Sequence, residues 1–133
     1  MLDTWKIVIE KNTLKTSPKE QELKLRLGKV TAIGIYFRPG CHDYVEARIL
    51  YEETQIFPMT SDEWAVASGM YVTAVYDEEL HIGSNILKFQ GCSPGTVARH
   101  TLTVYIAMDT KGKDALEDLA INLKKVTDTL GIT

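Results

Sequence analysis

The chain has 133 residues, of which 44% are hydrophobic and 25% charged, and its formal net charge is −3. These values are typical of one soluble globular domain with its own core, and they exclude a disordered or low-complexity chain. The first residues, MLDTWKIVIEK, carry an acid at Asp3 and contain no long apolar run. We therefore expect neither a secretory signal peptide nor a membrane span, and we expect the chain to be used without export by that route.

Charge is distributed unevenly along the chain. Residues 1–40 carry eight Lys or Arg against four acids, residues 41–80 carry one Arg against nine acids, and residues 81–133 carry six against five. The acidic middle argues against a nucleic-acid partner, because phosphate binding depends on clustered Lys and Arg. We interpret the acidic residues as solvated turns, with a charge-driven docking surface as the alternative.

Alternation of apolar and polar residues predicts a series of β-strands. The alternation is clearest at residues 22–27, where three leucines share one face and charged residues the other. Residues 29–37 are nearly apolar on both faces, which predicts a central strand that is covered on both sides. The remaining strands are predicted at residues 5–11, 42–51, 55–59, 71–76, 86–90 and 99–107.

Turn signals separate these strands. Pro39-Gly40 predicts a type II turn, the polar run at residues 12–21 predicts a loop, and the acidic runs at 61–63 and 77–79 predict turns. No segment between strands resembles a crossover helix, which disfavours a parallel sheet. The sequence therefore predicts an all-β fold over residues 1–110, an antiparallel, jelly-roll-like β-sandwich of about eight strands.

The last part of the chain, residues 111–133, has a different period. Its apolar residues follow steps of three and four, which is the heptad pattern of an α-helix. Asp114 and Glu117 resemble a capping box, and Gly131 is a natural stop. The sequence thus predicts one C-terminal amphipathic helix whose seam consists of Leu116, Leu119, Leu123, Val126 and Leu130.

A helix of this length is marginal alone in water, so its apolar seam must be buried. Two arrangements remain open at this point. The helix either docks on its own or a neighbouring sandwich, or it joins copies of itself in a small bundle, for which a trimer is one option. The seam residues are therefore predicted interface residues.

The sequence predicts no catalytic residues, no cofactor and no metal site. His42, His81 and His100 lie on different segments without metal-ligand spacing, and no serine lies in a nucleophile motif. The run GCSPG at residues 91–95 lacks the lysine of a phosphate-binding loop. We expect a protein without enzymatic activity.

Two cysteines, Cys41 and Cys92, each lie beside a Pro and Gly turn. If those turns meet at one end of the sandwich, a disulfide could join them. Without a secretory signal, buried free thiols are the preferred interpretation.

Trp64 is the aromatic residue with the clearest functional interpretation. It falls in a predicted turn, where a large aromatic side chain either closes the end of the sandwich or anchors an interface. Tyr36, Tyr44, Tyr51, Tyr71 and Tyr76 could join it in a sugar-stacking platform, although aromatic residues on strands commonly form cross-strand pairs.

One stretch resembles a known class of protein. The run GKVTAIGIYFRPGC, a following Val-containing strand, and QIFP followed by DEW resemble small β-sandwich structural proteins of tailed bacteriophages. The resemblance covers residues 28–70 and departs from the pattern at Arg38, where a second proline is expected.

This resemblance implies a non-enzymatic virion accessory protein, such as a decoration, head-fibre or tail-associated component. Such a protein acts by homo-oligomerisation and by binding a capsid or tail protein, in the virion or the cytoplasm, without nucleic-acid or membrane partners. The alternative function is a carbohydrate- or surface-binding β-sandwich module with glycans as ligands.

Overall fold

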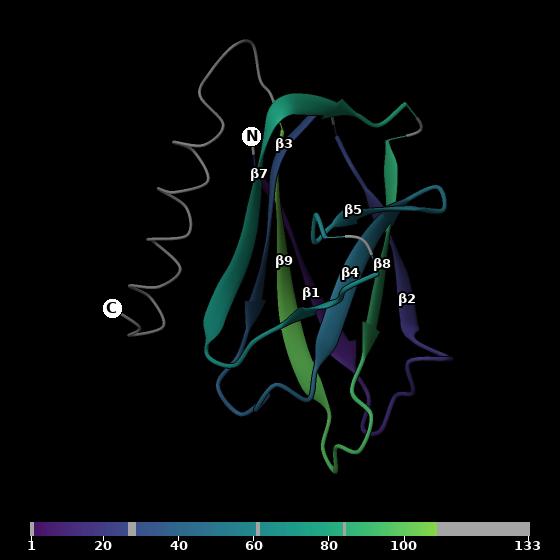
Figure 1. The fold of residues 1–133 in the computed structure, drawn as a ribbon, viewed down its shortest axis with the longest axis vertical. Coiled ribbons are helices and arrows are strands. Elements are labelled where there is room, and N and C mark those ends of the chain that lie inside the picture. Colours follow the sequence, from purple (N-terminus) through teal and green to yellow (C-terminus); the bar gives the residue numbers. More distant parts are fainter. Residues whose placement is uncertain (1, 27–28, 61, 84, 109–133) are drawn as a thin grey trace.

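The computed structural model of the chain describes residues 2–26, 29–60, 62–83 and 85–108. These residues form two antiparallel sheets that face each other across a common core (Figure 1). The predicted all-β sandwich is therefore confirmed. The predicted C-terminal helix, with its seam from Leu116 to Leu130, lies outside the described residues.

Among the described residues, sheet A has four strands and sheet B has five. Sheet A has the order β1 (Leu2–Ile9), β9 (His100–Met108), β3 (Lys29–Phe37) and β7 (Met70–His81). Sheet B has the order β2 (Lys19–Lys24), β8 (Ile86–Cys92), β4 (Glu46–Tyr51) and β5 (Thr54–Phe57), and the two-residue β6 (Ala65–Val66) also pairs with β4.

The pairing of the strands is nested. The first strand pairs with the last, β2 with β8, β3 with β7, and β4 with β5, all antiparallel. The chain therefore runs like one long hairpin that has been rolled into two layers, which is the connectivity of a jelly roll.

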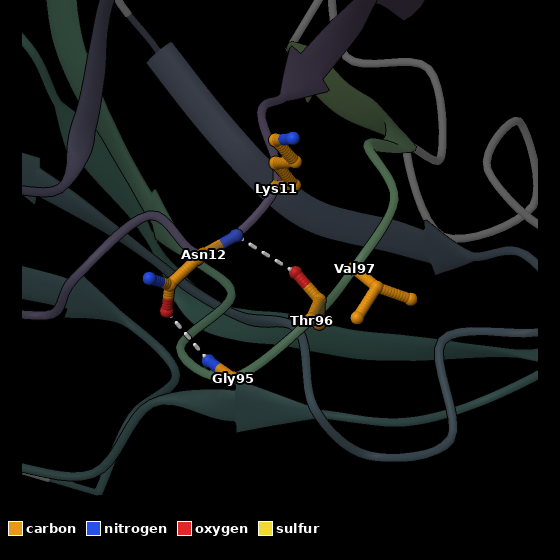
Figure 2. Close-up of a pocket in the computed structure, with 5 residues that line it drawn as sticks. All are labelled: Lys11, Asn12, Gly95, Thr96 and Val97. Carbon is orange, nitrogen blue, oxygen red and sulfur yellow. Dashed lines mark hydrogen bonds between the residues drawn. The ribbon is translucent and has the colours of Figure 1, made fainter.

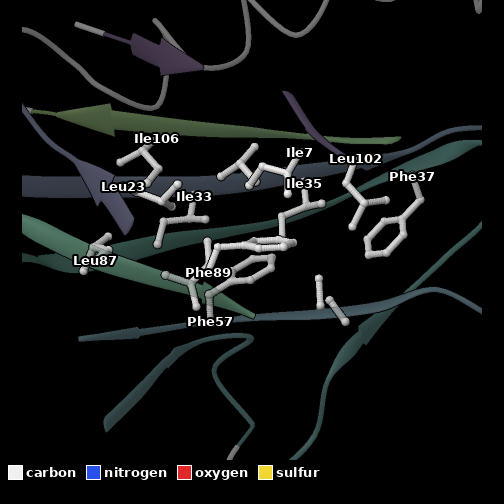
Figure 3. Packing of buried hydrophobic residues seen from close by; sticks show 14 of the residues in the cluster. Ile7, Leu23, Ile33, Ile35, Phe37, Phe57, Leu87, Phe89, Leu102 and Ile106 are labelled. Atoms are coloured by element: carbon white, nitrogen blue, oxygen red, sulfur yellow. The ribbon is translucent and has the colours of Figure 1, made fainter. Parts of the chain in front are cut away.

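Side chains from both sheets fill the space between the layers (Figure 3). Phe37 and Ile35 enter from sheet A, and Phe57 and Phe89 enter from sheet B. The inward positions predicted on the last strand are confirmed, since all three are fully buried in this cluster: Leu102, Val104 and Ile106.

The prediction that residues 29–37 form a covered central strand is also confirmed. β3 lies between β9 and β7, and every residue from Ala32 to Phe37 is buried, whichever face it occupies. Gly40 has a φ of 102°, as the predicted Pro39-Gly40 turn requires.

The acidic run at residues 77–79 was predicted as a turn, and this prediction is wrong. β7 continues through it to His81. The register with β3 shifts here, because Val30 pairs with Leu80 while Ala32 pairs with Val75. β7 is at the edge of sheet A, so the extra residues can bulge without breaking a second ladder.

Other boundaries moved for similar reasons. β1 begins at Leu2 instead of residue 5, and β2 begins at Lys19, inside the predicted loop at residues 12–21. Lys19 and Glu20 are exposed on the edge strand β2, so pairing with β8 does not require them to be apolar. The short β6, directly after Trp64, was not predicted.

Candidate functional site

Trp64 lies on sheet B, beside β4. β6 pairs with β4 so that Val66 faces Glu46 and Ala65 faces Ala47. The next position in this register sets Trp64 beside Arg48, whose Cζ is 4.5 Å from the centre of the indole ring. The Lys15 Nζ, from the connection between β1 and β2, is 5.1 Å from the same centre. Two cations therefore flank the ring, an arrangement in which each is attracted to the π-electrons.

Arg48 also begins a row of polar side chains that crosses sheet B. Its Nε donates a hydrogen bond of 2.7 Å to Gln90 on β8, and Gln90 Nε2 donates one of 2.7 Å to Glu20 on β2. These residues are register partners across three strands. The hydrogen bond from Gln90, followed by the charge of Lys88, lowers the pKa of Glu20.

Lys15 ties the β1–β2 connection to the same surface. Its Nζ lies 3.4 Å from Glu46 Oε1, and the thiol of Cys92 lies 3.9 Å from the other oxygen of Glu46. Trp64 is thus contacted from two separate parts of the chain, the β1–β2 connection and β4.

The aromatic residues suggested as a sugar platform do not gather around Trp64. Tyr36 and Tyr71 contact each other on sheet A, with ring centres 4.6 Å apart. Tyr51 and Tyr76 pack against the core, and Tyr44 is exposed in the β3–β4 loop. Sequence reasoning missed Arg48 and Lys15 as partners of Trp64. The alternation of residues 46–50 had nevertheless placed Glu46 and Arg48 on one face.

A second surface lies at one end of the sandwich. Four connections meet there, and we call this region the loop end: residues 10–18, 38–45, 67–69 and 93–99 (Figure 1). The nested strand pairing brings them to the same end, because every strand preceding one of these loops runs in the same direction.

The first and last of these loops are bonded to each other (Figure 2). The backbone N–H of Asn12 donates to Thr96 Oγ1 over 3.0 Å, and the N–H of Gly95 donates to Asn12 Oδ1 over 2.8 Å. Buried Ser93 adds a bond from its N–H to Thr13 O and another from its hydroxyl to Glu10 O, both 2.8 Å long. A shallow depression, open to solvent, lies over this junction.

The other two loops are also joined. The backbone N–H of His42 donates to the hydroxyl of Ser68 over 3.1 Å. Gly69, with a φ of 67°, turns the chain beside Pro39. A side chain at Gly69 would be strained by this φ.

Each of the four loops presents a large apolar side chain to solvent, either within the loop or directly after it. Their exposed fractions range from 51% for Leu14 to 92% for Val97. The same loops carry four Lys or Arg against two acids, a net of +2 in a chain of −3. Sequence reasoning missed this surface, although apolar residues within polar loop runs were a visible signal: Leu14, Tyr44, Met70 and Val97.

The two cysteines are free and buried, so the interpretation as free thiols is confirmed and the alternative disulfide is not formed. Burial raises the pKa of both thiols, and that of Cys92 reaches about 11 with the help of the Glu46 charge. Across residues 2–26, 29–60, 62–83 and 85–108, no group of three or more His, Cys, Asp or Glu could hold a metal ion. No helix in this part of the chain has the length and apolarity to cross a bilayer.

No protein-family model matches the chain, and no curated protein matches it either.

Proposed function

We propose that the chain is a non-enzymatic assembly protein of a tailed-bacteriophage virion, a decoration, head-fibre or tail-associated component that binds a protein shell through its loop end. The observation that carries the proposal is the exposed apolar side chain at each of the four loops. The jelly-roll connectivity supports it, since viral capsid proteins share that architecture. Fold alone does not establish function, so the proposal depends on the surface.

A single exposed apolar residue is ordinary, whereas several on one surface favour a protein interface. Here hydrogen bonds join the loops in two pairs, so little conformational entropy is lost when they dock. Tyr44 is suited to be an anchor, because tyrosine contributes a large contact area with few rotatable bonds. The net positive charge of the loops favours a partner with an apolar patch and an acidic rim.

The C-terminal helix at residues 111–133 is part of the proposal. Its heptad seam has to be buried, either against a sandwich or against copies of the same helix. Copies that bind equivalent positions of a symmetric shell are themselves arranged symmetrically, which makes the working form a homo-oligomer on the particle.

The test begins with virions produced from the genome that encodes this chain. Mass spectrometry of purified particles should detect the chain in a fixed ratio to the major shell protein. A chain that is absent from the particles overturns the proposal.

The second arm asks whether the loop end is the binding surface. Labelled chain should sediment with particles that lack it, and Tyr44→Asp with Val97→Asp should abolish this binding. The matched control is Met59→Asp, which puts the same charge on a residue that is 56% exposed and lies outside the four loops. An equal loss of particle binding in the loop-end variant and in Met59→Asp would contradict the assignment of the binding surface to the loop end.

Carbohydrate binding is the alternative function. The jelly roll also serves lectins, and Trp64 is partly exposed. A sugar ring could stack on the indole only if Lys15 and Arg48 moved away from it. A glycan array, followed by fluorescence of a Trp5→Phe variant in which Trp64 is the sole tryptophan, would reveal such a ligand.

A further inference from the structure

The outer face of sheet A, which points away from the core, carries a stripe of buried residues. It runs along the two central strands and includes Ala32, Gly34 and Tyr36 on β3 and Tyr105 and Ala107 on β9. Ala32 and Ala107 have no exposed surface, and the two tyrosines are at most 4% exposed. These residues form a cluster separate from the core between the sheets.

The stripe cannot be buried by its own side chains. Ala32 pairs with Ala107 and has Gly34 as its neighbour on the same face. Methyl groups and a glycine are too small to cover each other on an open sheet, where side chains stand perpendicular to the surface. Sheet B lies on the opposite face, so it cannot cover the stripe either.

The covered zone is narrow. On the edge strands of the same face, Leu2 and Tyr71 are half-buried against the stripe, whereas Thr4, Lys6, Thr73 and Val75 are exposed. Neighbouring strands lie about 4.8 Å apart, so the two central strands together offer a strip about the width of one α-helix. The pattern of burial fits one elongated element lying along β3 and β9.

One segment of the chain is suited to this position. β9 ends at Met108, next to Ala107, and 25 residues follow it. The predicted helix at residues 114–130 would be about 25 Å long at about 1.5 Å per residue. β9, with nine residues, extends about 30 Å at about 3.3 Å per residue, so the helix matches the length of the strand.

We propose that the C-terminal helix packs in cis on the outer face of sheet A, with its leucine seam over the stripe of Ala32, Gly34 and Ala107. The inference uses the helix expected from the heptad pattern and goes beyond the proposed function, because it holds whether or not the loop end binds a shell. The small residues let the helix approach the sheet closely. The described part of the chain ends at Met108, beside the stripe, and this proximity favours docking in cis over a bundle of copies.

The tyrosines of the stripe provide a reporter for this cover. Tyr71 lies between Tyr36 and Tyr105, with ring centres 4.6 Å and 6.1 Å apart. Burial, followed by these neighbours, raises the pKa of Tyr105 to about 12. Removal of the cover would return water to the phenol and lower its pKa towards the ordinary value of about 10.

The experiment follows tyrosinate absorbance of the full chain with pH, together with its mass by light scattering. Leu123→Lys puts a charge into the seam, and the matched control Asn122→Lys puts the same charge beside it. Leu119→Asn is a milder second variant in case the first fails to fold, and circular dichroism reports whether the sheets persist. Tyr105→Phe in each background identifies the signal of Tyr105.

We expect Tyr105 to titrate at high pH both in the full chain, measured as a monomer, and in Asn122→Lys. In the seam variants Tyr105 should titrate earlier, by about one to two pH units. Unchanged late titration in both folded seam variants overturns the proposal. A loss of the late Tyr105 titration on dilution, together with a fall in the mass measured by light scattering, also overturns the proposal, because a second copy of the chain would then be the cover.

Discussion

Arg48 stacks on the indole ring of Trp64, with its Cζ 4.5 Å from the ring centre, although sixteen positions separate the two residues in the chain. The register of β6 on β4 brings them together, since Ala47 faces Ala65 and the following position on β4 faces the residue before β6. The two-residue strand β6 thereby positions Trp64. Apart from the residues of the C-terminal seam, Trp64 is the only residue that the sequence predicted as an interface anchor.

The stacked pair should contribute measurably to stability. A double-mutant cycle with Trp64→Leu and Arg48→Met, followed by urea unfolding under circular dichroism, should give a coupling energy of about 0.5–1 kcal/mol. Lys88→Met with Trp64→Leu is the control pair, because Lys88 lies on the same sheet and has no stacking contact with Trp64 among the described residues. Equal coupling in the two cycles would show that the stacking contributes nothing specific.

Gly91 should not tolerate alanine. A Cβ at this position would overlap the end of Ile9 and lie 2.9 Å from the ring of Phe89, and both side chains are fully buried. We expect Gly91→Ala to lower the free energy of unfolding by about 1–3 kcal/mol, because the packed core must move apart. Gly83→Ala is the control, since its Cβ would meet only the Tyr51 hydroxyl at 3.5 Å. An unchanged urea midpoint for Gly91→Ala would mean that the core relaxes freely.

The hydroxyl of Tyr76 links the two sheets. It donates a hydrogen bond of 2.6 Å to the backbone carbonyl of Ile56. Tyr76→Phe leaves this part-buried carbonyl without its donor and should cost about 1–3 kcal/mol in thermal or urea unfolding. Tyr44→Phe removes a hydroxyl from an exposed side chain and should change stability by less than about 0.5 kcal/mol. Similar losses in both variants would contradict this assignment.

Stability should fall in alkaline solution. The pKa of the Cys92 thiol is raised by burial from 9.0 to about 11 in the folded chain, so above pH 9 the unfolded chain holds fewer protons than the folded one. The contribution of the neutral thiol is therefore complete below pH 9 and is lost as the pH rises through 11. Cys92→Ala should flatten the decline of the unfolding free energy between these pH values. A decline of equal slope in the variant would assign the effect to other groups.

Much of the architecture follows from local patterns. The alternation of residues 29–37 defined a strand whose boundaries agree with β3, and the inward faces of the last strand followed from the same period. Errors arose where edge strands tolerate polar residues. Lys19 and Glu20 belong to β2, and the acidic run at 77–79 belongs to β7, because an edge position does not require an apolar residue.

The candidate sites depended more on tertiary structure. The sequence drew attention to Trp64, but its cationic partners come from the β1–β2 loop and from β4, far away along the chain. The loop end was not foreseen, since nothing local says which loops share an end of the sandwich. Leu14 and Val97 are ordinary loop residues until the pairing of β1 with β9 and of β2 with β8 brings their loops together.

The sequence by itself determined the class of fold, the positions of most strands and the side of each strand that faces the core. These features depend on period and composition, which act over a few neighbouring residues. Only the tertiary structure decided that the strands pair in nested order, that four loops converge, and that a stripe of small residues on sheet A is covered. Pairing between distant strands depends on the complementary burial of whole faces, and no short stretch of the chain contains that information.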